Sequence, residues 1–140
     1  MQKTIFITGA SSGLGKASAK LFQEKGWNVI ATMRRPEEEK ELNGLSSVTL
    51  VGLDVTDTIK SQETIAEILK SNSVDVVLNN AGYGLIGPLE SFTAEQIQMQ
   101  IQTNLMGVSL FQGKKKRDVH KCHQYFRLIG IPDLFYLQRQ

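Results

Sequence analysis

Residues 4–15 read TIFITGASSGLG, and this stretch decides the fold of the chain. Its first five residues are apolar or β-branched, which is typical of a strand buried on both faces of a parallel sheet. Glycines follow at positions 9, 13 and 15, and a helical pattern begins there with Leu14, Ala17, Leu21 and Phe22. Such a turn can aim helix N–H groups at a phosphate, but it also occurs as an ordinary connection. The stretch predicts a strand–turn–helix unit.

Apolar runs recur along the chain and alternate with segments of helical spacing. They cover residues 28–32, 48–53 and 74–78, and Gly26 is placed to end the first helix before the first of them. Between the last two runs, one helical face is marked by Ile65, Ile68 and Leu69. Strands that alternate with helices at this pace favour right-handed βαβ units. The predicted fold class is therefore α/β, a doubly wound, Rossmann-like parallel sheet.

A further helix has a clear beginning. Residues 93–96 read TAEQ and match a capping box, and Ile97, Ile101 and Val108 are expected to follow on one inward stripe. Asn104 lies three residues after Ile101, so it is expected on the same inward face. A polar residue in that place is either satisfied by the backbone of a neighbour or used in chemistry.

The composition changes abruptly near residue 112 of this 140-residue chain. Residues 1–112 have a formal net charge of −3, whereas residues 113–140 have +5 and neither strand nor helix periodicity. We therefore predict two parts, an ordered α/β unit over 1–112 and an atypical basic tail over 113–140. The sheet is expected to be truncated after the fourth strand and its following helix, which leaves residues 74–78 as an unpaired, aggregation-prone edge.

Several functional classes are disfavoured by composition. One cysteine, Cys122, permits no internal disulfide, and no secretory signal is recognisable, so a cytoplasmic location is expected. Every apolar run falls short of the ~20 residues of a membrane span. His120, Cys122 and His123 are too few for a closed zinc site, so no metal is expected. The basic run at 114–117 lacks interleaved aromatic residues, so no nucleic acid partner is expected.

Three more segments support a functional role for the glycine turn. Asp54-Val55-Thr56 follows the third predicted strand, and residues 79–82, which read NNAG, follow the fourth. Taken together, TGxxxGxG, DVT, NNAG and the helical Asn104, in that order, resemble the short-chain dehydrogenase/reductase family over residues 3–108. The resemblance implies hydride transfer between a nicotinamide dinucleotide and an alcohol or carbonyl group of a small molecule.

The resemblance also assigns roles to the matching positions. It implies that the glycine turn holds the cofactor pyrophosphate, that Asp54 accepts from the adenine amino group with Val55 beside it, and that residues 79–82 run under the nicotinamide ribose. The implied cofactor-binding residues here are Gly9, Ser11, Ser12, Gly13, Leu14, Gly15, Asp54, Val55, Asn79, Ala81 and Gly82. For Asn79 and Asn80, an ordinary role in capping the strand end remains open.

The residues after the second predicted strand indicate which dinucleotide is preferred. A carboxylate at that place accepts from a free ribose 2′-hydroxyl, whereas arginine pairs with a 2′-phosphate. Arg34 and Arg35 stand there, and no acidic residue precedes Glu37. The predicted cofactor is therefore NADP, with NAD less favoured. A solvated arginine pair on a surface loop is the alternative interpretation.

The family's catalytic serine and its Tyr-x-x-x-Lys motif are not recognisable. Tyr83, Tyr125 and Tyr136 have Gly, Ile and Gln four residues later, which leaves Asn104 as the one residue that matches the catalytic group. This points to an oxidoreductase of the NADP(H)-dependent type whose activity is missing from the chain as written. A non-catalytic dinucleotide-binding or interaction module and the product of a damaged gene are the alternatives. The substrate and the oligomeric state are not readable.

The tail suggests a reason for the missing residues. Read one base later, the codons of residues 121–126 permit Asn-Val-Ile-Asn-Ile-Ser, and those of residues 137–140 permit Tyr-Asn-Ala-Ser. Both resemble segments that the family places after its catalytic asparagine. Residues 113–140 are thus interpreted as a frameshifted part of a reductase gene, with a genuine short variant as the alternative.

Overall fold

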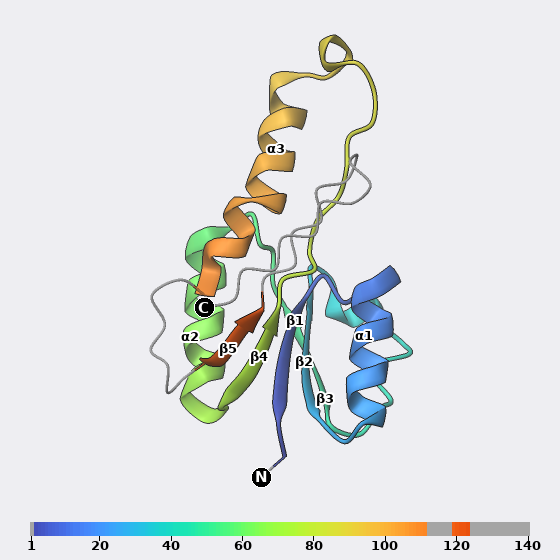
Figure 1. Ribbon diagram of the computed structural model, residues 1–140, viewed down its shortest axis with the longest axis vertical. Helices are drawn as coiled ribbons and strands as arrows, with labels where there is room; N and C mark the ends of the chain where they lie inside the picture. Colours follow the sequence, from blue (N-terminus) through green and yellow to red (C-terminus); the bar gives the residue numbers. More distant parts are fainter. Residues whose placement is uncertain (1, 112–118, 124–140) are drawn as a thin grey trace.

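The computed structural model describes residues 2–111 and the backbone of residues 119–123. These residues form one five-stranded sheet with the order β3-β2-β1-β4-β5 and with every adjacent pair parallel (Figure 1). The strands are β1 (Thr4–Thr8), β2 (Asn28–Met33), β3 (Val48–Gly52), β4 (Val74–Leu78) and β5 (Val119–His123). The predicted α/β, doubly wound class is confirmed, and each predicted strand lies within one residue of its observed bounds.

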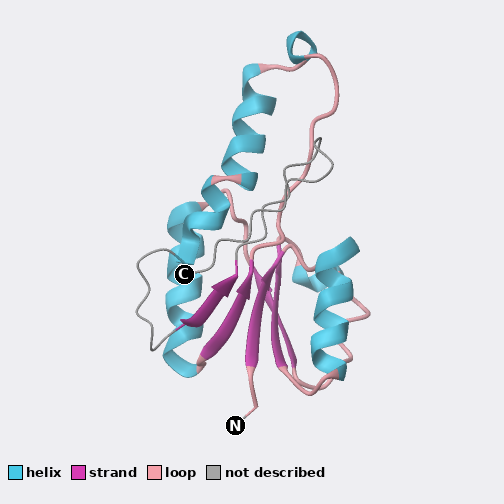
Figure 2. Cartoon of the chain, viewed as in Figure 1, coloured by secondary structure: helices cyan, strands magenta, loops and turns pink. Residues whose placement is uncertain are grey.

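Helices cover both faces of the sheet (Figure 2). Along β1, Ile5 and Ile7 pack in the cluster that includes Ala19 of α1 (Gly13–Glu24), and Phe6 packs in the cluster that includes Ile65 of α2 (Thr58–Ser71). All five residues of β1 are buried. The alternating sides of a strand explain why this run is apolar without interruption.

The buried face of α1 differs from the predicted stripe. Leu14 and Leu21 are 63% and 50% exposed, and the buried residues are Gly15 and Ala19. Small residues face the sheet because the glycine turn holds the start of the helix close against it. The predicted end is confirmed, since Gly26 has φ +78°, and its N–H donates to Gln23 O at 2.9 Å.

The predicted capping box at Thr93 is present and begins α3 (Ala94–Asn104). The expected single inward stripe is wrong, because no residue of α3 is buried and Ile101 is 51% exposed. The chain tightens into a 3₁₀ helix, η3 (Met106–Phe111), which changes the helical register. Burial is concentrated there, and Phe111 packs edge-on against Phe6 with ring centroids 4.8 Å apart.

The sheet does not end at β4, which corrects the expected unpaired edge. β5 runs parallel to β4, with Val74 opposite Val119 and Leu78 opposite His123. The backbone hydrogen bonds of that pairing occupy the edge that residues 74–78 were expected to expose. Within the ranges that the structure describes, no helix is long and apolar enough to cross a membrane.

Candidate functional site

A cleft of about 440 Å³ lies at the carboxyl ends of β1 to β4. Ligands of doubly wound sheets bind at this edge, next to the point where the strand order reverses. Ten of the predicted site residues line the cleft: Gly9, Ser11, Ser12, Gly13, Leu14, Arg34, Asp54, Val55, Ala81 and Gly82. Four strand ends thus bring together residues that are far apart in the sequence.

The floor of the cleft is a turn that only glycine fits. Gly9 and Gly13 have φ values of +68° and +54°, in the left-handed region. A Cβ at Gly9 would lie 2.7 Å from Ala81 Cα, and a Cβ at Gly15 would lie 2.3 Å from Gly9 O. The close packing of the turn on residues 80–82 therefore depends on these glycines. Gly15 supports the turn from below and does not line the cleft.

The start of α1 suits an anionic group. Ser12 is the N-cap residue, but its side chain makes no capping hydrogen bond, so the helix begins without a side-chain acceptor for its first N–H groups. Around Gly13, a Cβ would meet nothing within 4 Å, so the approach from the cleft is open. Uncapped N–H groups and the positive helix end together favour a phosphate at this place.

Thr8 and Asn80 fix the turn to the end of β4. The buried Thr8 Oγ1 accepts from the backbone N–H groups of Asn80 and Ala81, both at 3.0 Å. Asn80 Nδ2 in turn donates to Thr8 O at 3.1 Å and to Gly9 O at 2.9 Å. Asn80 also lines the cleft, although the prediction named only its neighbours as site residues. Its position directly after a buried strand was the available signal.

Asn79 lies beneath this edge of the sheet rather than in the cleft. It is buried, and neither polar atom of its carboxamide has a hydrogen-bond partner in the described part of the chain. A buried amide without partners is costly, by about 1–3 kcal/mol. Asn79 does not line the cleft, unlike its neighbours Asn80 and Ala81, and the cofactor-binding role implied for it stays a prediction.

Asp54 lines the cleft, and its surroundings favour the ionised carboxylate, which accepts hydrogen bonds. Burial would raise the pKa of Asp54, but hydrogen bonds from Thr56 and the charge of Arg34 outweigh it and lower that pKa below 3.8. Thr56 donates to Asp54 Oδ1 from its backbone N–H at 3.0 Å and from its hydroxyl at 2.7 Å. An ionised, oriented carboxylate can accept from an amino group in the cleft.

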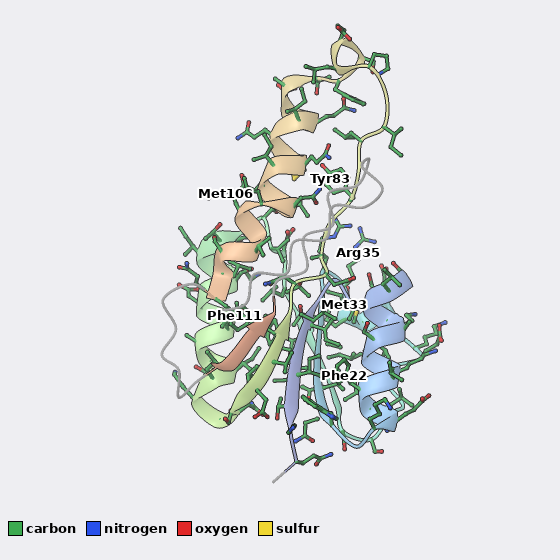
Figure 3. All side chains as sticks on the ribbon, in the orientation of Figure 1. Phe22, Met33, Arg35, Tyr83, Met106 and Phe111 are labelled. Carbon is green, nitrogen blue, oxygen red and sulfur yellow. The ribbon has the colours of Figure 1, made fainter. Side chains whose placement is uncertain are left out.

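The two arginines after β2 have different surroundings. Arg34 lines the cleft, and no ion pair of the described residues engages it. Arg35 lies outside the cleft lining and forms an ion pair with Glu38 Oε1 at 3.0 Å. Figure 3 shows Arg35 near Met33, at the carboxyl end of the sheet. Arg34 is therefore the arginine available to a ligand.

The family model for short chain dehydrogenases matches residues 3–114. The chain belongs to this family. A 3-ketodihydrosphingosine reductase of Bacteroides thetaiotaomicron is 40% identical over 105 residues, which are 74% of this chain and 37% of that protein. The chain thus spans little more than a third of the length of this curated relative.

Solved structures of short-chain dehydrogenases share the fold. One from Streptomyces avermitilis has a TM-score of 0.74 and 32% sequence identity, over 79% of this chain and 42% of that chain. ElxO with NADP bound has a TM-score of 0.70 and 32% identity, over 79% of this chain and 47% of that chain. The family match and the shared fold therefore both include the glycine turn, Asp54 and residues 79–82.

Asn104, the residue that matches the catalytic group of the family, is satisfied by a neighbouring backbone. Its Oδ1 accepts from Tyr83 N at 3.0 Å, and its Nδ2 donates to Tyr83 O at 2.7 Å. The carboxamide of Asn104 thus makes two hydrogen bonds to the backbone of Tyr83, as a neighbouring strand would. These bonds hold the segment after Gly82 in place. It does not line the cleft.

Other residues that were not predicted to bind the cofactor also line the cleft. They come from the strand ends and from α3: Met33, Leu53, Thr56, Tyr83, Met99 and Thr103. The α3 residues carried no motif, and their place depends on the angle at which α3 leaves the sheet. In the described residues, no group of three His, Cys, Asp or Glu side chains could hold a metal ion. The side chains of His120, Cys122 and His123 lie outside the described part.

Proposed function

We propose that this chain binds NADP(H) in the cleft and that it is the cofactor-binding portion of an NADP(H)-dependent oxidoreductase acting on an alcohol or carbonyl group. The observation that carries the proposal is the convergence of three features on one cleft. They are the uncapped start of α1 above an obligatory glycine turn, the ionised Asp54, and the unpaired Arg34. Phosphate, amino and 2′-phosphate groups of one dinucleotide match these features.

Each binding residue has a task that its contacts support. The N–H groups at the start of α1 would hold the pyrophosphate, and Asp54 would accept from the adenine amino group. The segment 79–82, held by Thr8 at Asn80 and Ala81 and by Asn104 at Tyr83, would form the surface under the nicotinamide ribose. The bound dinucleotide supplies the hydride, so this part of the chain contributes binding and orientation.

Arg34 gives the first test of this proposal. We expect wild-type chain to bind NADPH about 10- to 100-fold more tightly than NADH, because a charge-assisted bond to the 2′-phosphate is worth about 1.5–3 kcal/mol. Replacing both arginines (Arg34→Asp with Arg35→Ala) should remove the preference, since the new carboxylate repels the phosphate. Calorimetric titration with both dinucleotides measures it. Equal wild-type affinities would reject the NADP assignment.

The second part of the proposal is that the tail, residues 113–140, is translated out of frame. The codons of residues 121–126, read one base later, permit a segment that resembles the family's fifth strand. The shifted reading of residues 137–140 resembles the start of the tyrosine motif. Sequencing the coding DNA from codon 107 to beyond codon 140 tests this. Stop codons in the shifted frame, or the absence of the implied tyrosine and lysine codons there, would contradict it.

A further inference from the structure

Glu39 is the one charged residue that is buried in the part of the chain described by the structure. Its side chain is 4% exposed, and Oε2 forms an ion pair with Lys16 Nζ at 2.9 Å. The other oxygen, Oε1, accepts from the backbone N–H groups of Glu41 at 2.9 Å and Leu42 at 3.1 Å. Both oxygens are therefore engaged, as a buried carboxylate requires.

These contacts join the loop after β2 to the helix that follows the glycine turn. Lys16 lies in the first turn of α1, where its N–H donates to Ser12 O at 3.3 Å. Leu42 is fully buried in the cluster that contains Ala19 of α1. The loop is thus attached to α1 by the buried Lys16–Glu39 pair, by more exposed pairs of Glu41 with Lys16 and Lys20, and by core packing.

The segment that carries Arg34 is consequently held at both ends. On one side, Met33 is buried and its carbonyl accepts from Leu53 N at 2.8 Å. On the other side, Glu39 is tied to Lys16. Residues 34–38 bridge these two fixed points, so Arg34 cannot move far from the cleft that it lines. Arg35 is turned to Glu38 instead.

We propose that the buried Glu39, through its ion pair with Lys16, is a positioning residue that fixes Arg34 over the cleft and so sets selectivity for a 2′-phosphorylated dinucleotide. This inference rests on the proposed binding of NADP(H). Glu39 does not line the cleft, so it would act through the loop that carries Arg34. Arg34 is the phosphate ligand because it lines the cleft, whereas Arg35 does not.

The charge state of the pair is suited to this role. Burial would raise the pKa of Glu39, but the hydrogen bond from Lys16 and those from Leu42 and Glu41 together lower it below 4.5. Hydrogen bonds to Glu39 and Glu41 raise the pKa of Lys16 above 10.5. Near neutral pH both partners are charged, so the tie is present when the dinucleotide binds.

The test compares two substitutions that break the same ion pair, Glu39→Gln and Lys16→Gln. We expect each to weaken NADPH binding about tenfold while the Kd for NADH changes by less than about twofold, because only the 2′-phosphate depends on Arg34. A general loss of structure would weaken both dinucleotides together. Lys70→Gln is the matched control, since it removes an exposed ion pair of α2 that does not involve the loop after β2 and should leave the ratio unchanged.

The outcomes separate the two proposals. Wild-type chain with equal affinities for NADPH and NADH would overturn the NADP assignment itself. The positioning role alone would be overturned by one pattern of results. In that pattern the wild-type chain prefers NADPH, Arg34→Gln removes the preference, and Lys16→Gln and Glu39→Gln both retain it. If Glu39→Gln fails to fold, Lys16→Gln decides, because its side chain is at the accessible end of the pair. Equal weakening of both dinucleotides by Lys16→Gln also overturns the role.

Discussion

The 140-residue chain is expected to consume no NADPH above background with any member of a panel of aldehydes and ketones. A carbonyl that accepts a hydride needs a proton, and loss of a general acid costs about 10²–10⁴ in rate. Loss of a donor that holds the developing oxyanion costs about 10²–10³ more. The written sequence contains no Tyr-x-x-x-Lys to supply these groups. Asn104 cannot replace them, because both ends of its amide bind the backbone of Tyr83.

The control for this assay is a chain in which the shifted frame is restored from the region of residue 121 and extended through the implied lysine. We expect the restored chain to turn over at least about 10⁴-fold faster, from the two costs just given. Turnover by the unrestored chain would refute the inactive interpretation. A restored chain that folds and binds NADPH but has no activity would remove the main support for the frameshift.

The second large effect is expected from Gly15→Ala. The new Cβ would lie 2.3 Å from Gly9 O and 2.4 Å from Asn80 Nδ2, and both belong to the structure that forms the cleft floor. The turn or the start of α1 must therefore move, which typically costs about 1–3 kcal/mol of unfolding free energy. Because the same backbone would hold the pyrophosphate, we expect NADPH affinity to fall by at least about a hundredfold.

Gly44→Ala is the matched control for that substitution. A Cβ at Gly44 meets nothing within 4 Å, so the substitution should leave stability within about 0.5 kcal/mol and binding unchanged. Urea unfolding and calorimetry measure the two effects. A stable Gly15→Ala chain with wild-type affinity would show that the close approach at the turn is not needed.

The sheet was predictable because buried parallel strands have an uninterrupted apolar pattern. The β1 run and the positive φ of Gly26 both follow from local sequence. The helix faces were harder to predict. Leu14 and Leu21 fit a helical stripe, yet the turn requires Gly15 to face Gly9 and Asn80, and this rotates the leucines outward. Close backbone packing thus outweighed the hydrophobic pattern.

The candidate site was predictable where motifs follow strand ends and not where tertiary packing decides. Residues 9 and 11–14 of the glycine turn, Arg34, Asp54 and Gly82 line one cleft, and their binding of a cofactor stays a prediction. The difference between Arg34 and Arg35 depends on Glu38, and the tie between Lys16 and Glu39 joins elements that are 23 residues apart in sequence. The Arg35–Glu38 pair is a local i,i+3 contact, but the Lys16–Glu39 pair has no pattern in the sequence, because it is set by how the loop after β2 lies on α1.

The measurement that tests the central claim most directly is an NMR titration of the chain with NADP⁺. The account predicts saturable shifts of the amides at the start of α1, at Arg34, at residues 54–56 and at residues 80–82. Amides of α2 far from the cleft should not respond. Saturable binding that shifts other amides, or spectra that do not change at millimolar NADP⁺, would contradict the claim that this cleft holds the dinucleotide.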